Sequence, residues 1–290
     1  PSFNSRVTEL LLCSNITDAM SDAGVLQFTS HQFFAQMLHQ NPNHRAELDA
    51  LFPPGQIFRV VSRFLFRPNA EVSRIVGDFQ SQHFADRHTV GLQIRSVGFN
   101  GVSMFDDEYD VFRKKALELS KPDSVWFIAT DTGESQQYIK QRWSGDGHDI
   151  VFIPHTRSNN PNGVRLAMAD LVLLGLCDEL VITSYSTYGN VAAAWSVSGR
   201  APWIVTDRRE PNEGVVSFGR FPEGHRREMP HDTTAPMYMG VPQASERRLW
   251  CERLPTIEPC HHYYGIWRPD RASCFKQSMI EEEMRGGRYC

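Results

Sequence analysis

Short apolar runs alternate with helical segments through the middle of this chain, and this alternation constrains its fold more than any other feature. The apolar runs, which are predicted to be strands, cover residues 89–94, 124–129, 149–153, 179–183 and 203–206. The segments between them, which are predicted to be helices, cover residues 106–119, 134–143, 163–176 and 188–197. Regular alternation of this kind predicts a parallel sheet with right-handed helical crossovers. We therefore expect an α/β domain built on a parallel sheet.

The regions before and after this alternation have different sequence patterns. Residues 1–85 are predicted to be mostly helical, although the apolar run 57–66 fits a strand as well as a helix. Residues 207–250 lose the pattern and are rich in Pro, Gly, Arg, Met and His, which indicates a long surface excursion. We expect three regions: a helical 1–85, an α/β domain over 86–206, and an excursion with a cysteine-rich tail over 207–290 that packs on that domain.

The overall composition excludes several classes of protein. Of 290 residues, 41% are hydrophobic and 22% are charged, which is ordinary for a globular protein with a core of its own. The formal net charge of -4 leaves no broad basic field, so nucleic acid is not expected as a partner. No apolar run reaches the roughly 18 residues of a membrane-spanning helix. The chain starts at Pro1 and shows no apolar leader.

Cysteines gather in the last part of the chain, which is polar and poor in helix or strand pattern. The four in that region are Cys251, Cys260, Cys274 and Cys290. We expect disulfides there and an oxidising compartment, with Cys260 paired to Cys274. Zinc is the alternative, because two histidines follow Cys260, but no tight Cys-x-x-Cys spacing is present. Cys13 and Cys177 read as lone apolar residues, and Asn15 begins an Asn-Ile-Thr acceptor pattern for N-glycosylation.

Polar residues follow the predicted strands where ligands of parallel sheets bind, beyond the carboxyl ends. Arg95 follows the first strand and could clamp a pyrophosphate with its planar fork, or form a surface ion pair. Asp131 follows the second strand and could orient Arg95 or a loop backbone, and Gln93 is a possible supporting residue. His155 follows the third strand and could contact base, ribose or phosphate, or be structural.

The fourth strand ends in a hydroxyl-rich turn, residues 184–189, that opens directly into a helix of small residues. Free N–H groups and the positive end of the helix dipole make such a place an anion site. Ser184, Ser186 and Thr187 could add hydroxyls to a phosphate, although Ser and Thr also cap helices routinely. Tyr188 could pack on a nucleobase or fill the core. The pattern predicts a diphosphate as ligand.

Asp170 and the acidic run 106–108 bear on whether a guanine base or a metal ion is bound together with that diphosphate. Asp170 lies in an otherwise apolar helix, where a carboxylate needs a partner. The N1–H and amino group of guanine would supply two donors; a buried cap or ion pair is the alternative. The acidic run 106–108 resembles a cation-binding cluster, but it sits at a helix start, where acids favour the dipole. We expect no metal, so Arg95 and the helix N-terminus would balance the charge of a departing diphosphate.

Three segments resemble the motifs of fucosyltransferases, namely VGLQIR at 90–95, FIATD at 127–131 and ADLVLLGLCDELVITSYSTYG at 169–189. The resemblance is greatest to the plant xyloglucan fucosyltransferases and covers residues 31–203, with an isolated patch near Cys260. It implies a GT-B fold, with a Rossmann-like domain that binds GDP-fucose and a partial N-terminal, acceptor-side domain. It also implies metal-independent transfer of fucose, with inversion, to a hydroxyl of a glycan, either a cell-wall polysaccharide or a glycoprotein.

The resemblance also implies roles for single residues. Arg95 is similar to the arginine that holds the donor pyrophosphate and is the expected catalytic residue. The other expected donor-binding residues are His155, Asp170, Ser184, Ser186, Thr187, Tyr188 and Gly189. No general base is assigned, and Asp106 and His155 are the candidates. Neither a Gly-x-Ser-x-Gly elbow nor a Gly-x-Gly-x-x-Gly fingerprint occurs, so a serine hydrolase and a dinucleotide-binding enzyme are not expected.

The plant enzymes are type II Golgi membrane proteins with lumenal catalytic domains. The resemblance therefore implies the Golgi lumen, with the membrane anchor in a segment absent from this chain. Two alternatives stay open: a glycosyltransferase that uses another nucleotide sugar, such as UDP-galactose, and a non-catalytic remnant that binds a nucleotide or a glycan.

Overall fold

The computed structural model describes residues 11, 13–23, 25, 38–39, 41–53, 56–96, 106–154, 160–183, 186–207 and 249–253. These residues fall into two compact units, and the boundary between the units along the chain lies between Val61 and Ser62. No helix among the described residues is long and apolar enough to cross a membrane.

The first unit contains the short helices α2 (Ile16–Ala19) and α4 (Arg45–Leu51). Asn15 caps α2, since its side chain accepts a hydrogen bond from the N–H of Asp18. Asn41 is buried and donates to the carbonyl oxygens of Leu11 at 3.0 Å and Ser14 at 2.8 Å, which ties the segment before α2 to the segment before α4.

Two cysteines expected to be lone apolar residues behave differently. Cys13 is disulfide-bonded, so that prediction was wrong for Cys13. Cys177 is a buried free thiol whose pKa is raised by burial, as expected for an apolar environment. Cys260, Cys274 and Cys290 lie outside the described residues, and a disulfide between the first two stays a prediction.

The second unit is a six-stranded sheet in the order β3-β2-β1-β4-β5-β6. Its strands are β1 (Thr89–Ile94), β2 (Val125–Thr130), β3 (Asp149–Val151), β4 (Glu179–Thr183), β5 (Trp203–Asp207) and β6 (Leu249–Arg253). All pairs from β3 to β5 are parallel, and β6 pairs antiparallel with β5. The predicted α/β fold with a parallel sheet is thereby confirmed.

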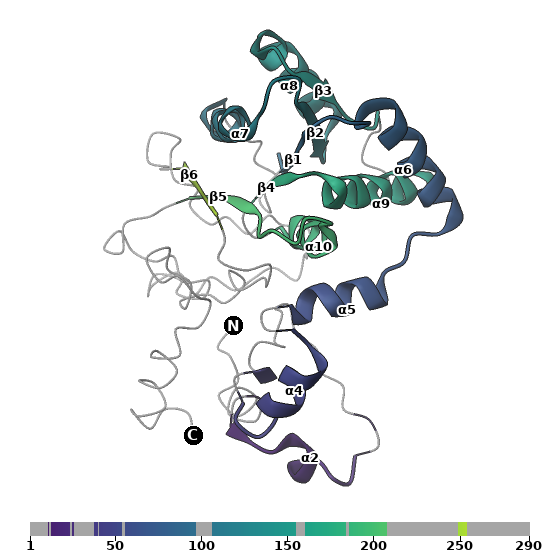
Figure 1. The fold of residues 1–290 in the computed structure, drawn as a ribbon, viewed down its shortest axis with the longest axis vertical. Helices are drawn as coiled ribbons and strands as arrows, with labels where there is room; N and C mark the ends of the chain where they lie inside the picture. Colours follow the sequence, from purple (N-terminus) through teal and green to yellow (C-terminus); the bar gives the residue numbers. More distant parts are fainter. Residues whose placement is uncertain are drawn as a thin grey trace, which may run out of the picture. The chain divides into compact units, whose positions relative to one another are not determined.

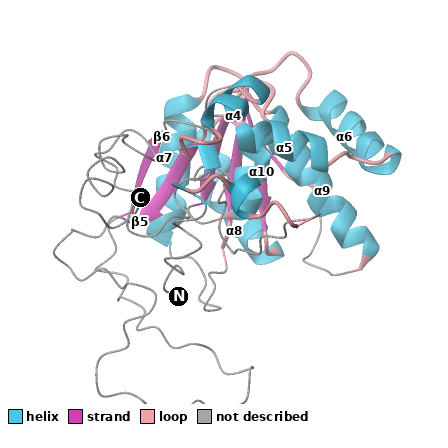
Figure 2. Cartoon of the chain, turned by 90° about the horizontal axis from the view of Figure 1, so that it is seen from below, coloured by secondary structure: helices cyan, strands magenta, loops and turns pink. Residues whose placement is uncertain are grey.

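Helices connect the strands and cover the sheet (Figures 1 and 2). They are α6 (Ala70–His83), α7 (Asp106–Leu119), α8 (Gly133–Trp143), the short 3-10 helix η1 (Ser144–Asp146), α9 (Pro161–Leu176) and α10 (Thr187–Trp195). Helices α7 and α8 cover one face of the sheet, whereas α6, α9 and α10 lie on the other (Figure 1). The helix α5 (Ile57–Leu65) precedes α6, so the ambiguous apolar run is helical.

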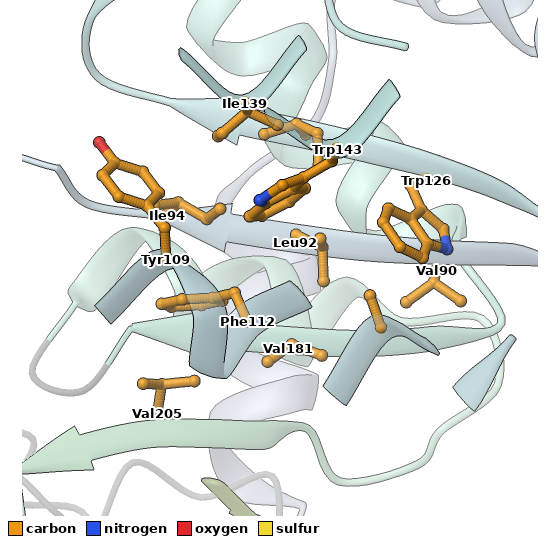
Figure 3. Packing of buried hydrophobic residues seen from close by; sticks show 12 residues of the cluster. Val90, Leu92, Ile94, Tyr109, Phe112, Trp126, Ile139, Trp143, Val181 and Val205 are labelled. Carbon is orange, nitrogen blue, oxygen red and sulfur yellow. The ribbon is translucent and has the colours of Figure 1, made fainter. Parts of the chain in front are cut away.

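The core lies between the central strands and both helical layers. Alternate residues of β1 point toward α7 and α8, where Leu92 meets fully buried Phe112 and Trp143 (Figure 3). On the other face, a Cβ on Gly91 would lie 2.9 Å from the sulfur of Cys177, so only glycine lets the chain after α9 approach β1 so closely. Because β1 and β2 are buried on both faces, their sequences are apolar runs rather than alternating ones.

Strand β6 was not expected from the sequence. Its five residues, LWCER, carry too short a pattern to distinguish a strand from a loop. The strand forms because β5 would otherwise be an open edge, and the backbone groups of β6 complete the hydrogen bonding of that edge. Cys251 of this strand packs against the core, which explains the apolar centre of the segment.

Candidate functional site

The strand order reverses at β1. The chain passes from β1 outward to β2 and β3, and then returns to β4 on the other side of β1. In open α/β sheets, ligands bind at such a switch point, beyond the carboxyl ends of the two adjacent strands. Arg95 directly follows β1, and Ser186 caps α10, the helix that follows β4. The structure therefore places at one edge of the sheet the two elements that the sequence predicted to bind a diphosphate.

Hydrogen bonds from both neighbouring strands hold the backbone around Arg95. The N–H of Arg95 donates to Oγ1 of Thr183 at 2.9 Å, at the end of β4. The N–H of the next residue, Ser96, donates to Oδ1 of Asp131 at 2.8 Å, and the Ser96 hydroxyl bonds the same oxygen. Of the two roles expected for Asp131, the structure shows the one in which its carboxylate holds a loop backbone.

Ser186 begins α10 and is almost fully buried. Its Oγ accepts the N–H of Gly189 at 3.3 Å, which is an ordinary N-cap, and its carbonyl accepts from the side-chain amide of Asn190 at 3.0 Å. Thr187, the first residue of the helix, is exposed. The hydroxyl of Ser186 thus orients the helix N-terminus, and that of Thr187 lies on the solvent side of it.

Helix α10 is pressed closely against the sheet at its first turn. A Cβ on Gly189 would lie 2.7 Å from Oε1 of Gln93 and 2.9 Å from Cβ of Ile182, so this position requires glycine. Gln93 is itself buried, and its Oε1 accepts the N–H of Thr183 at 3.1 Å. Gln93, expected as a supporting residue, therefore joins β1 to β4 directly below the helix N-terminus.

The other end of α10 is capped by a cation. Nη2 of Arg63 donates to the carbonyl oxygens of Trp195 at 3.0 Å and Ser196 at 3.1 Å. A guanidinium at a helix C-terminus satisfies unpaired carbonyls and complements the negative end of the dipole. The helix is therefore held at one end by Arg63 and at the other by its serine cap, with its positive end at the switch point.

Asp170 and Tyr188 lie together between α9 and α10. The carboxyl of Asp170 is 3% exposed, and burial raises its pKa well above the ordinary value. The hydroxyl of Tyr188 donates to the carbonyl of Ala167, and both burial and the neighbouring Asp170 raise the pKa of the phenol. Tyr188 thus helps to join the two helices, and a contact of Asp170 with guanine stays a prediction.

Some nominated residues lie outside the described part of the chain, namely His155 and Ser184. Asp106 is the first residue of α7, as the sequence indicated. Among the described residues, no group of three or more His, Cys, Asp or Glu side chains is arranged to hold a metal ion. Metal independence and the identity of a general base both stay predictions.

Thr183 and Ser96 are site residues that the sequence analysis did not nominate. Thr183 is the last residue of β4, where its polar side chain marks the end of an apolar run. Ser96 directly follows Arg95 and is buried, with 2% exposure. The position of each at a strand end was a usable signal, but their partners come from other strands and are set by the pairing order.

Comparison with known proteins relates this geometry to fucosyltransferases. Residues 4–117 match the sequence profile of the family described as xyloglucan fucosyltransferase. Probable fucosyltransferase 5 of Arabidopsis thaliana is 24% identical over 239 residues, which are 72% of this chain and 44% of that protein. Probable fucosyltransferase 4 of the same plant is 26% identical over 241 residues, again 72% and 44%. The chain thus spans less than half the length of these relatives.

A solved structure shares the fold. A mutant of Arabidopsis thaliana FUT1 in complex with GDP superposes with a TM-score of 0.55 and 22% identity, over 70% of this chain and 48% of that one. At this level of identity the likeness concerns the fold alone. The fold of this chain is therefore shared, over the part that superposes, with that of FUT1.

Proposed function

Because this chain resembles the plant xyloglucan-type fucosyltransferases in sequence and in fold, we propose that it transfers fucose from GDP-fucose to a hydroxyl of a glycan. The acceptor would be a cell-wall polysaccharide or a glycoprotein glycan, and the reaction would invert the anomeric carbon without a metal. The donor diphosphate would lie at the switch point between β1 and β4.

The observation that supports this proposal is that Arg95 and the N-terminus of α10 follow two neighbouring strands of the sheet. Arg95 follows β1, and the N-terminus of α10 follows the neighbouring strand β4, so both belong to the same edge of the sheet. A guanidinium and a helix N-terminus are each typical ligands of phosphate oxygens. That a fucosyltransferase structure with this fold was solved with GDP also supports a GDP-sugar as the donor.

In the proposed reaction, the acceptor oxygen attacks the anomeric carbon of fucose from the face opposite to the diphosphate. The bond between that carbon and the phosphate oxygen breaks, GDP leaves with the electron pair, and the acceptor proton passes to a base. Negative charge then grows on the β-phosphate. Arg95 and the α10 dipole would stabilise this charge, which is the reason for proposing that no metal is needed.

We also propose that the protein works in an oxidising, glycosylating compartment such as the Golgi lumen. The disulfide at Cys13 is consistent with such a compartment. The acceptor pattern at Asn15 agrees with it, although the Asn15 amide also donates to Asp18 at 2.6 Å within the α2 cap. Mass mapping of the secreted chain would test this: a free thiol at Cys13 and an unmodified Asn15 would contradict it.

The function is tested by binding and turnover on the same preparation. We expect calorimetry to show binding of GDP and GDP-fucose but not of UDP or UDP-galactose, and labelled fucose to appear on xyloglucan oligosaccharides. Preference for UDP would favour another nucleotide sugar, and GDP binding without any transfer would favour a non-catalytic protein. EDTA should leave transfer intact, and a loss that Mn²⁺ restores would contradict metal independence.

A further inference from the structure

Thr183, the last residue of β4, forms hydrogen bonds both to the end of β1 and to the start of α10. Its hydroxyl donates to the carbonyl of Gln93 at 3.0 Å and accepts the N–H of Arg95 at 2.9 Å. Its own N–H donates to Oε1 of Gln93 at 3.1 Å, and its carbonyl accepts the N–H of Ser186 at 3.3 Å. One residue therefore bonds the strand that carries Arg95 and the segment that begins α10.

The hydroxyl of Thr183 stands in for a backbone group. The parallel pairing of β1 with β4 ends at the pair Gln93 and Ile182. At the next residue, Thr183, β4 still pairs with Val205 of β5 but no longer with β1. Instead, the Thr183 hydroxyl bonds the carbonyl of Gln93 and the N–H of Arg95, the two groups that continued pairing with β4 would have bonded. A hydroxyl can do this because it both donates and accepts. The separation between Arg95 and the start of α10 is therefore set by a side chain.

We propose that Thr183 is a positioning residue for the nucleotide diphosphate site, and that it acts by holding Arg95 at a set distance from the N-terminus of α10. This inference rests on the proposed function. A diphosphate bridges the two positive groups only if their spacing matches that of its oxygens, and a displacement of about 1 Å is costly in a site of this kind. The close packing of Gly189 on Gln93 holds the helix side of the same connection.

The chain offers a matched control at the opposite edge of the sheet. At the opposite end of β1, the hydroxyl of Thr89 donates to Oδ2 of Asp178 at 3.1 Å and accepts the N–H of Asp178 at 3.0 Å. Like Thr183, it makes one donated and one accepted bond to a neighbouring segment. Thr89→Val therefore removes a donated and an accepted hydroxyl bond, as Thr183→Val does, at the edge of the sheet away from Arg95.

The test measures GDP affinity by calorimetry for wild type, Thr183→Val, Thr183→Ser and Thr89→Val. We expect Thr183→Val to bind GDP about tenfold more weakly, the effect of one misplaced charge-assisted contact. Thr183→Ser keeps the hydroxyl and should stay within about twofold of wild type, as should Thr89→Val despite its lower stability. Equal loss of affinity in both valine variants would mean a general structural effect and would overturn the proposal.

A double-mutant cycle with Arg95→Ala separates positioning from stability. If Thr183 acts through Arg95, Thr183→Val should change GDP affinity by less than about twofold when Arg95 is already absent. An undiminished tenfold effect in that background would overturn the role assigned to Thr183. Should the valine variant not fold, Thr183→Ala against Thr183→Ser makes the same comparison. If the alanine variant also fails to fold, Thr183 is a folding residue and the proposal is wrong.

The outcomes also distinguish this inference from the function on which it rests. A wild-type protein that binds no GDP would overturn the proposed function, and the inference with it. Wild-type binding that Thr183→Val leaves unchanged would overturn the inference alone. In a transfer assay, the positioning role predicts a raised KM for GDP-fucose in Thr183→Val, with recovery in Thr183→Ser.

Discussion

The two edges of the parallel sheet are both lined with polar residues, but these residues have different partners. At the edge where the strands begin, side chains form hydrogen bonds with one another and with the backbone at the start of the strands. The carboxylate of Asp178 accepts the N–H of Thr89 at 2.8 Å and its hydroxyl at 3.1 Å. Arg87 donates to Asp149 at 2.7 Å and to the carbonyl of Asp123 at 3.0 Å. At this edge, polar side chains therefore bond the segments where β1, β2 and β3 begin and the turn before β4.

At the edge where the strands end, polar side chains instead bond the backbone of loops. Thr183 holds the N–H of Arg95, Asp131 holds that of Ser96, and Ser186 caps α10. These contacts orient backbone groups and a helix dipole toward one place. The starting edge, where the strands begin, thus uses its polar side chains to bond strand starts, whereas the finishing edge, where the strands end, uses them to hold the loop after β1 and the first turn of α10.

Replacing an arginine at each edge tests this comparison most strongly. Arg95→Ala should weaken GDP binding by about 1.5 to 3 kcal/mol, the scale of hydrogen bonds to a charged group. Arg87→Ala should leave GDP affinity unchanged and lower the free energy of unfolding by about 1 kcal/mol or less, as expected for a partly exposed ion pair. Calorimetry and urea unfolding measure the two effects. Equal GDP affinity in Arg95→Ala and wild type would remove Arg95 from the site.

A glycine pair tests whether close packing at the finishing edge matters. Gly189→Ala should lower the free energy of unfolding by about 1 to 3 kcal/mol, because the new methyl meets Gln93 and Ile182. The control is Gly77→Ala in α6, where a Cβ meets nothing within 4 Å. That change should raise stability by about 0.5 to 1 kcal/mol through helix propensity. Thermal unfolding that ranks the two variants the other way would contradict the packing argument.

The starting edge is tested by removing its carboxylate acceptor. Asp178→Ala leaves the buried N–H of Thr89 without this partner and should lower the free energy of unfolding by about 1 to 2 kcal/mol. GDP affinity should not change. Asp78→Ala is the control, since Asp78 pairs with Arg74 on the exposed side of α6 and should cost less than about 0.5 kcal/mol. Weaker GDP binding in Asp178→Ala would show that the two edges are not independent.

The smallest expected effect concerns Asp170 and depends on pH. Because burial raises its pKa in the folded state, the native protein binds more protons than the unfolded chain above pH of about 4. This group's contribution to stability is therefore present at low pH and is lost as the pH rises toward the raised pKa. Asp170→Asn lacks this loss, so its stability relative to wild type should increase with pH. Parallel pH profiles of urea unfolding in the two proteins would contradict the prediction.

The same variant tests the expected contact with guanine. Inosine diphosphate lacks the amino group of guanine, so wild type should bind GDP more tightly than inosine diphosphate if Asp170 accepts from that group. Asp170→Asn should reduce this preference. An equal preference in both proteins would assign Asp170 to the interior alone, where Tyr188 is its neighbour.

Much of the α/β domain was predictable because its central strands β1 and β2 are buried on both faces and the middle of β4 is buried. Each parallel strand appeared as an apolar run, and the observed bounds of β1 and β4 agree with the predicted ones. The run 57–66 stayed ambiguous because apolar density alone does not separate a helix from a buried strand. Strand β6 was missed because its five residues are defined by pairing with β5, about forty residues away.

The site was predictable in its residue types but not in its connections. Arg95 and the hydroxyl-rich turn could be assigned to one edge of the sheet, since carboxyl ends of parallel strands share an edge. The chain itself did not reveal that β4 inserts beside β1, nor that Asp131 holds the residue after Arg95. Strand order depends on how helices of both layers pack, which no local pattern encodes.

The sequence by itself determined the α/β class, the segments that form strands and helices, and the chemistry available where the strands end. Apolar runs, helix caps and strand-terminal polar residues are local features, and local sterics and burial are enough to specify them. Only the tertiary structure decided that Arg95 and α10 are neighbours and that Thr183 connects them. Such contacts join residues about ninety positions apart, and they form only when the whole sheet has assembled in one order.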